Sequence, residues 1–186
     1  GLRPVDRSFE SWWVRPGSAT AVELHAGDRV TIRDPDGGQA AEVTVAPDAL
    51  GLPMDGPATV LRDLRDEDFL RSLHAKGVPP DEARAARLFG PDSRPGASQS
   101  FDVDRDAMLV VAAPGGRLVD GDPPASALVV EVKRHSPRKP ADVPLPEPLA
   151  EPRLDFRVDR ASALSYEVKE GEYIQVIDVQ GRQCSD

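Results

Sequence analysis

The sequence predicts a mainly β (α+β) fold: a β-barrel or sandwich with a small helical insertion, followed by the first strands of a second copy. Three observations indicate this fold. Short alternating apolar segments are separated by Gly and Pro turns, two β-branched strands occur at 108–112 and 127–132, and an N-terminal segment recurs 144 residues later. Strands that frame a short helical segment favour a barrel or sandwich over a parallel α/β sheet.

The recurring segment aligns residues 14–42 with residues 158–186 without gaps. Eight of the 29 aligned pairs are identical: Val14/Val158, Ser18/Ser162, Ala19/Ala163, Glu23/Glu167, Gly27/Gly171, Asp34/Asp178, Gly37/Gly181 and Gln39/Gln183. A period this long indicates a duplicated domain and not a solenoid. The alternative is that any two β-hairpins with a glycine turn resemble each other.

Local patterns predict the elements of the first copy. Residues 21–24 and 30–32 alternate as half-buried strands around a turn at 26–28. Asp34-Pro35-Asp36-Gly37 is a turn sequence, and residues 39–45 leave it as a third strand. Leucines on one face predict a helix over 60–75. Pro79 and Pro80, followed by two acids, predict a short helix ending at Leu88.

The chain divides into three parts on this evidence. Residues 1–135 form the first domain. Residues 136–152 hold six prolines, which resist helix and ladder pairing, and are expected to be an extended linker. Residues 153–186 are the start of a second copy, and we expect the chain to be a fragment of a longer protein.

Composition restricts the partners and the compartment. The formal net charge is −9, and the arginines are scattered among acids. Nucleic acids and anionic membranes reward clustered Lys and Arg, so neither is expected as a partner. The single cysteine points to the reducing cytoplasm. The expected partners are the remainder of the parent chain and, through exposed strand edges, further copies in a homo-oligomer.

Few residues are candidates for chemistry. The three histidines lack a His or Cys at ligand spacing, so no metal site is expected and all three are assigned to the surface. The stronger candidate for a functional site is the end of the second copy. It comes just after a tight turn, where substrate contacts are common. Cys184 and Asp186 are the candidate catalytic residues there, and Arg182 and Gln183 the candidate substrate-binding residues. The first copy has Ala40 and Ala41 where the second has Cys184 and Ser185, so it lacks these reactive groups.

At this motif the chain resembles the urea carboxylase-associated domain family. The resembling stretches are 27–39 and, more closely, 166–186, ending in Gly181-Arg182-Gln183-Cys184-Ser185-Asp186. The resemblance implies a compact β-rich fold and a role in small nitrogen-compound metabolism. Enzymatic members carry a Cys/His metal site in the later half of the domain, whereas residues 98–133 contain neither. A cysteine before proline in the family is replaced here by Ala113 before Pro114.

These departures predict a degenerate, non-catalytic first copy. Some family members lead larger chains that end in a folate-dependent aminomethyltransferase resembling the T-protein of glycine cleavage, and that architecture fits best. It implies no cofactor in this chain and tetrahydrofolate in the parent protein. The alternatives are a fragment of a metal-dependent amidine or carboxyguanidine deiminase and a binding or assembly module without chemistry.

Overall fold

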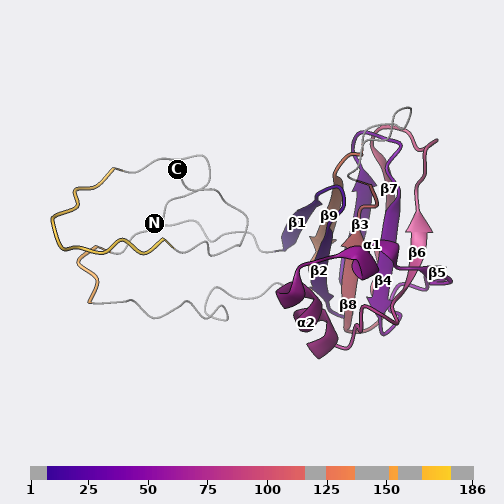
Figure 1. Ribbon diagram of the computed structural model, residues 1–186, viewed down its shortest axis with the longest axis horizontal. Coiled ribbons are helices and arrows are strands. Elements are labelled where there is room, and N and C mark those ends of the chain that lie inside the picture. Colours follow the sequence, from indigo (N-terminus) through magenta and orange to yellow (C-terminus); the bar gives the residue numbers. More distant parts are fainter. Residues whose placement is uncertain (1–7, 116–124, 137–150, 155–164, 177–186) are drawn as a thin grey trace. The chain divides into compact units, whose positions relative to one another are not determined.

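The computed structural model describes residues 8–115, 125–136, 151–154 and 165–176 (Figure 1). The chain separates into two compact units, an N-terminal unit, Gly1–Pro137, and a C-terminal unit, Arg138–Asp186. The described part of the N-terminal unit is mainly β, with two antiparallel sheets and a short helical insertion. This is the sandwich that the alternating segments predict.

Along much of the chain, successive strands belong to different sheets. The first sheet has the order β1-β9-β3-β7. Its strands are β1 (Phe9–Val14), β9 (Leu128–Lys133), β3 (Arg29–Asp34) and β7 (Ala97–Asp102). The second sheet has the order β2-β8-β4-β6-β5. Its strands are β2 (Ala19–Leu24), β8 (Ala107–Ala112), β4 (Ala41–Ala46), β6 (Arg84–Leu88) and β5 (Gly56–Pro57). All paired strands in both sheets run antiparallel.

One apolar cluster fills the space between the sheets, and both sheets contribute to it. Alternate residues of each strand point inward, as the period of two requires. The fully or nearly fully buried members are Val14, Val22, Leu24, Val30, Ile32, Ala41, Val43, Val45, Leu109, Val111, Leu128, Val130 and Val132. The outward residues of β3, such as Arg29 and Thr31, stay at least partly exposed. Burial of each Val, Leu or Ile side chain in this cluster contributes roughly 1.5–3 kcal/mol to stability.

A second, smaller cluster lies on the other face of the β2-β8-β4 sheet. There α1 (Thr59–Asp63) and α2 (Glu67–Ala75) cover that face (Figure 1). Leu61 and Leu73 of the helices are buried against Met108 and Val110 of β8. Strand β8 therefore buries both faces, which explains its unbroken apolar run.

Two predicted helical segments differ from the structure. Residues 60–75 form two helices instead of one, because Asp66 begins α2 by accepting a hydrogen bond from the Phe69 N–H at 3.0 Å. The prediction of a helix that ends at Leu88 is wrong. Residues 84–88 form β6, which pairs with β4, and sheet pairing outweighs the helix propensity of its alanines. Strands β1 and β7 were not predicted.

The strands on either side of Gly27 do not form a hairpin. Strand β2 pairs with β8 in one sheet, whereas β3 pairs with β9 and β7 in the other. The turn between them therefore carries the chain from one sheet to the other. Both strands still direct their apolar residues into the shared interior.

The C-terminal unit is described only in part. Residues 165–176 contain a turn at Glu170 and Gly171, flanked by backbone outside any strand. Residues 174–178 align with residues 30–34 of β3, but residues 174–176 form no strand, and residues 177–178 lie outside the described residues. The linker expected at 136–152 also lies almost wholly outside them. Within the described ranges no helix is long and apolar enough to cross a membrane.

The turn after β3 supports a stability prediction. Gly37 has φ +81°, and an added Cβ would lie 2.7 Å from the Pro95 nitrogen. Gly51 has φ +66°, but nothing lies within 4 Å of its would-be Cβ. Gly51→Ala should cost roughly 1–2 kcal/mol of unfolding free energy from backbone strain alone, and Gly37→Ala distinctly more. Denaturant unfolding of both variants measures the difference, and equal losses would contradict the close approach.

Candidate functional site

The described residues include the segment that aligns with the candidate motif. Residues 38–42 align with residues 182–186 and follow the turn that leaves β3. Asp34 is fully buried at the head of this turn. Its carboxylate accepts hydrogen bonds from the Gly37 N–H at 2.9 Å, the Gln39 N–H at 3.0 Å and the Ser93 hydroxyl at 2.6 Å. Asp34 and Gly37 thus build the turn, as the sequence predicts.

Gln39 is a buried bridge between three segments. Its amide nitrogen donates to the carbonyl oxygens of Ala40 at 2.9 Å and Pro114 at 2.8 Å. Its amide oxygen accepts from the Ser126 N–H at 2.9 Å. The side chain joins the start of β4 to the residues that follow β8 and precede β9. With its polar atoms engaged inside the protein, Gln39 acts as a structural residue.

The remaining motif positions are also structural in this copy. Ala41 is fully buried in the cluster between the sheets. Glu42 is 5% exposed and accepts hydrogen bonds from the Thr59 hydroxyl and, at 3.0 Å, from the Val60 N–H. Glu42 therefore holds the beginning of α1 against β4. Local sequence patterns do not indicate this contact, because Glu42 and Val60 are 18 residues apart.

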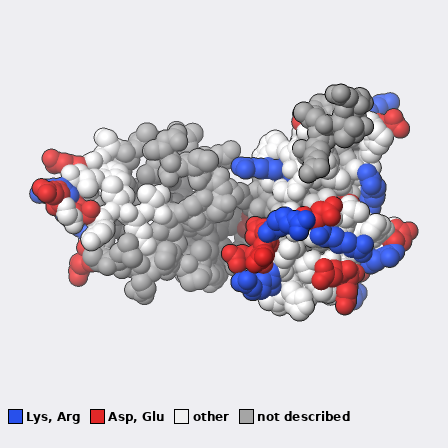
Figure 2. Space-filling model, in the orientation of Figure 1, with Lys and Arg blue, Asp and Glu red and all other residues white. Residues whose placement is uncertain are grey.

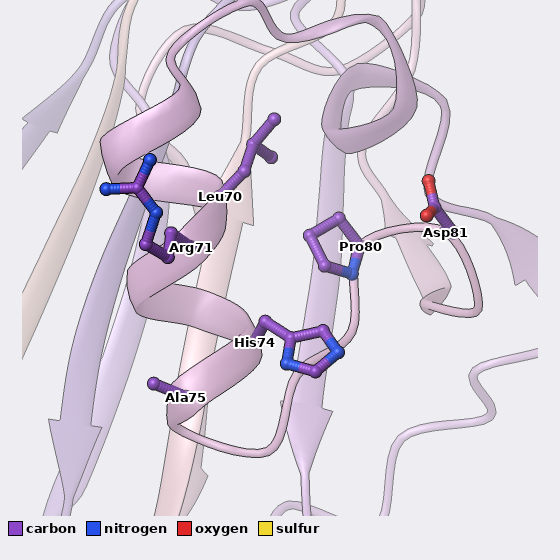
Figure 3. Close-up of a pocket in the computed structure, with 6 residues that line it drawn as sticks. All are labelled: Leu70, Arg71, His74, Ala75, Pro80 and Asp81. Carbon is purple, nitrogen blue, oxygen red and sulfur yellow. The ribbon is translucent and has the colours of Figure 1, made fainter.

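Two depressions on the described part of the N-terminal unit carry no cluster of reactive side chains. One of about 80 Å³ lies beside Glu42 and β6, below the usual size of a ligand site. A larger, open one of about 430 Å³ lies between α2 and the turn before β6. Figure 3 shows Leu70, His74 and Pro80 at this surface, with Arg71 and Asp81 at its margins. Leu70, Ala75 and Pro80 make the lining of the depression largely apolar. Arg71, which pairs with Asp68 at 3.1 Å, adds charge at its edge.

The histidines lie at the surface, as the sequence predicts. His25, His74 and His135 are all exposed. His25 lies 3.8 Å from the Asp106 carboxylate, and the ring of His135 packs against Gly27. Within residues 8–115, 125–136, 151–154 and 165–176, no three His, Cys, Asp or Glu side chains gather as metal ligands. The described residues thus offer no ready metal centre.

Charged side chains on the face seen in Figure 2 alternate in sign, and Lys and Arg lie beside Asp and Glu. Among the described residues, exposed ion pairs include Arg29 with Asp102 and Lys76 with Glu23. A phosphate backbone is bound by a surface of one sign. This face has no such surface.

The most developed polar network surrounds the turn that joins the two sheets. Asp28 is 1% exposed, and its carboxylate accepts from the N–H groups of His25 and His135, both at 3.0 Å. Arg134 donates to the same carboxylate at 2.7 Å, to the Glu23 carbonyl at 2.7 Å and to Glu10 at 2.6 Å. We call this network the Arg134 clamp. It ties β1, the β2–β3 turn and the end of β9 together.

The pKa of Asp28 follows from these contacts. Burial of Asp28 alone would raise its pKa, but the hydrogen bonds from His25 and His135 and the guanidinium of Arg134 outweigh burial. The pKa of Asp28 is therefore lower than usual, and the carboxylate is held in its charged form. The sequence did not reveal Arg134, although the recurring Gly-acid pair at 27–28 and 171–172 marked the turn.

The turn at Gly171 in the C-terminal unit has the same local geometry. Gly27 and Gly171 have φ +88° and +86°. Glu172, the counterpart of Asp28, accepts from the Lys169 N–H at 2.7 Å, as Asp28 accepts from His25. Arg153 donates to Glu172 at 2.6 Å and to the Glu167 carbonyl at 2.8 Å. Glu167 is the counterpart of Glu23, whose carbonyl accepts from Arg134.

The arginines that complete the two turns come from different places in the chain. Arg134 directly follows β9, whereas Arg153 precedes Gly171 by 18 residues. The hydrogen bonds from Arg153 and from Lys169 lower the pKa of Glu172.

The candidate residues Arg182, Gln183, Cys184 and Asp186 lie outside the described residues. Their roles stay predictions. What the structure describes is the set of positions in the first copy with which they align.

The Arg134 clamp supports a prediction about pH. Because the pKa of Asp28 lies below its unfolded value of about 3.9, its stabilisation is complete above that pH and is lost as the pH falls through the lower, folded value. Asp28→Asn should lower the unfolding free energy by about 1–3 kcal/mol at neutral pH. The gap between wild type and variant should shrink below about pH 4.

The matched control is Asp102→Asn, which removes the exposed partner of Arg29. An exposed pair is worth about 0–1 kcal/mol, so this variant should unfold nearly as wild type does. Urea unfolding at several pH values measures both. A loss for Asp28→Asn that is no larger than the control's, or that grows at acid pH, would refute the clamp.

No profile of a known protein family matches the chain. A de novo designed double-stranded β-helix is similar with a TM-score of 0.28 and 15% identity, over 67% of this chain and 95% of the designed one. A TM-score this low carries no conclusion about the fold.

A sequence relative is trimethylamine-oxide aldolase of Ruegeria pomeroyi, 36% identical over 189 aligned residues. The alignment takes in 94% of this chain and 24% of the relative. The chain thus spans about a quarter of the relative's length and is homologous to that part of trimethylamine-oxide aldolase.

Proposed function

We propose that residues 1–135 are a non-catalytic domain of a longer protein of nitrogen and one-carbon metabolism, and that the chemistry resides in other parts of that protein. The observation that carries this proposal is the match to trimethylamine-oxide aldolase, which takes in nearly all of this chain but a quarter of the relative. A chain that corresponds to a quarter of an enzyme, and a domain that is part of that chain, need not contain its active site.

The interior of the first domain supports a non-catalytic role. General acid–base and nucleophilic chemistry need a reactive group held by a partner at a cleft. The space between the sheets is filled by Val, Leu, Ile and Ala side chains. The buried polar groups at the motif, Asp34, Gln39 and Glu42, are engaged in hydrogen bonds that hold turns and α1. These groups are used for folding.

The proposed chemistry of the longer protein is cleavage of trimethylamine oxide, the compound in the relative's name. The resemblance stated above adds a folate-dependent aminomethyltransferase part, with tetrahydrofolate as its cofactor. A folate-dependent part would supply an acceptor for a one-carbon unit released from a methylated amine.

Cys184 is the residue of the second copy that we propose for a catalytic role. The first-copy counterparts of Gln183 and Asp186 are Gln39 and Glu42, and both have structural roles. This favours a structural role for Gln183 and Asp186 as well, and weakens the assignments made from the sequence alone. Arg182 and Cys184 differ from their counterparts Gly38 and Ala40 in chemistry, so the repeat does not predict a structural role for them.

The direct test is turnover. The purified 186-residue chain should leave trimethylamine oxide unconsumed, and should be equally inactive on carboxyguanidine and on methylamine donors with tetrahydrofolate. The longer polypeptide should consume trimethylamine oxide. In it, Cys184→Ala should lower kcat roughly 100-fold or more if the thiol takes part in proton transfer. Ala40→Ser, at the counterpart position in the first copy, should leave kcat unchanged.

Consumption of any of these compounds by the 186-residue chain that disappears on Cys184→Ala would show that the second copy is catalytic within this chain. Equal kcat for the Cys184→Ala variant and wild type in the longer polypeptide would remove Cys184 from the active site.

A further inference from the structure

The C-terminal unit exposes an apolar stripe whose spacing follows the repeat. Four of its large apolar side chains are 43–68% exposed: Tyr166, Val168, Ile174 and Val176. Their counterparts in the first copy are Val22, Leu24, Val30 and Ile32, which are 0–3% exposed. All four counterparts belong to the cluster between the two sheets. The exposed stripe therefore has the residue pattern of an interior face.

The outward position of the repeat behaves differently. Tyr173 is 81% exposed, and its counterpart is Arg29, an exposed residue on the outer face of the first sheet. Tyr173 and Ile174 are neighbours of similar apolar character. The repeat assigns them to opposite faces of one strand, since successive side chains of a strand alternate.

The turn between the two halves of the stripe is already formed. Gly171 has the left-handed backbone of Gly27, and Glu172 and Arg153 repeat the contacts of Asp28 and Arg134. In the first copy that turn sends β2 and β3 into separate sheets, where β2 pairs with β8 and β3 pairs with β9. The same turn in the C-terminal unit prepares residues 165–168 and 173–176 for two such pairings.

We infer that this stripe, Tyr166, Val168, Ile174 and Val176, is the inner face of a second β-sandwich. It is covered by two apolar β-strands, at the positions of β8 and β9, that the longer polypeptide supplies. The inference rests on the proposed duplication and on the match to a quarter of a larger relative. The covering strands are Val- and Leu-rich, as β8 and β9 are, because their side chains must meet these four residues.

A second copy of this chain does not fit the stripe as well. In the N-terminal unit β8 lies between β2 and β4, and β9 lies between β1 and β3. Both edges of each strand are hydrogen-bonded, so neither strand is available to pair with another molecule. The occupant must bring its own strands.

Hydrogen exchange in the longer polypeptide and in the 186-residue chain tests the inference. Amides of residues 165–176 should exchange at least about 100-fold more slowly in the longer polypeptide, where the strands are paired and covered. In the longer polypeptide, Ile174→Asp should reduce that protection at least about tenfold, because it buries a charge. Tyr173→Asp, the matched control, should leave it unchanged.

Equal exchange of residues 165–176 in the two lengths of wild-type chain would overturn the inference, whether or not the variants fold. Equal effects of Ile174→Asp and Tyr173→Asp would overturn the assignment of faces. Protection in the 186-residue chain that grows with protein concentration would assign the stripe to self-association instead. These outcomes are independent of turnover, so a failure here is distinct from a failure of the proposed function.

Discussion

The interior shared by the two sheets is the constraint on which the rest of this structure depends. Strands from both sheets direct alternate Val, Leu, Ile and Ala residues into one continuous cluster. Protein interiors are packed as tightly as organic crystals, so a space filled in this way has no room for a substrate. Ala41 illustrates the consequence, since at a motif position it serves only to complete the packing. The filled interior supports the proposed scaffold role of this domain.

The turn that carries the chain from one sheet to the other contains a buried charged group, whose burial would be unfavourable without partners. Asp28 is buried, and its charge is tolerated because two N–H groups and Arg134 surround it. Removing one member of such a set leaves the other uncompensated, which is more costly than the net value of the pair. The recurrence of the same contacts at Glu172 and Arg153 shows that this way of turning the chain is used twice. These shared contacts support the proposed duplication independently of the sequence identities.

Much of the fold could be predicted from local patterns. The strands at 19–24, 29–34, 107–112 and 128–133 have strong alternation or β-branched runs, and the Asp34–Gly37 turn has its characteristic residues. Strand β6 was mistaken for a helix because Pro79, Pro80 and the two acids after them are typical of a helix start, and its pairing with β4 joins residues 43–47 positions apart. Strand β7 is Ser-rich and exposed, so it has little apolar pattern to detect. The clamp from Arg134 and the anchor from Glu42 join residues 106 and 18 positions apart, distances that local patterns do not report.

The central claim is that the first domain is a closed scaffold that binds no substrate. Titrating the methyl-labelled 186-residue chain with trimethylamine oxide, and following Val43, Val45, Leu109 and Val111 by NMR, tests this most directly, since these side chains line the space between the sheets. A closed interior should give no saturable shift of these methyl signals. A saturable shift confined to them would show that the interior admits a ligand and would contradict the scaffold role.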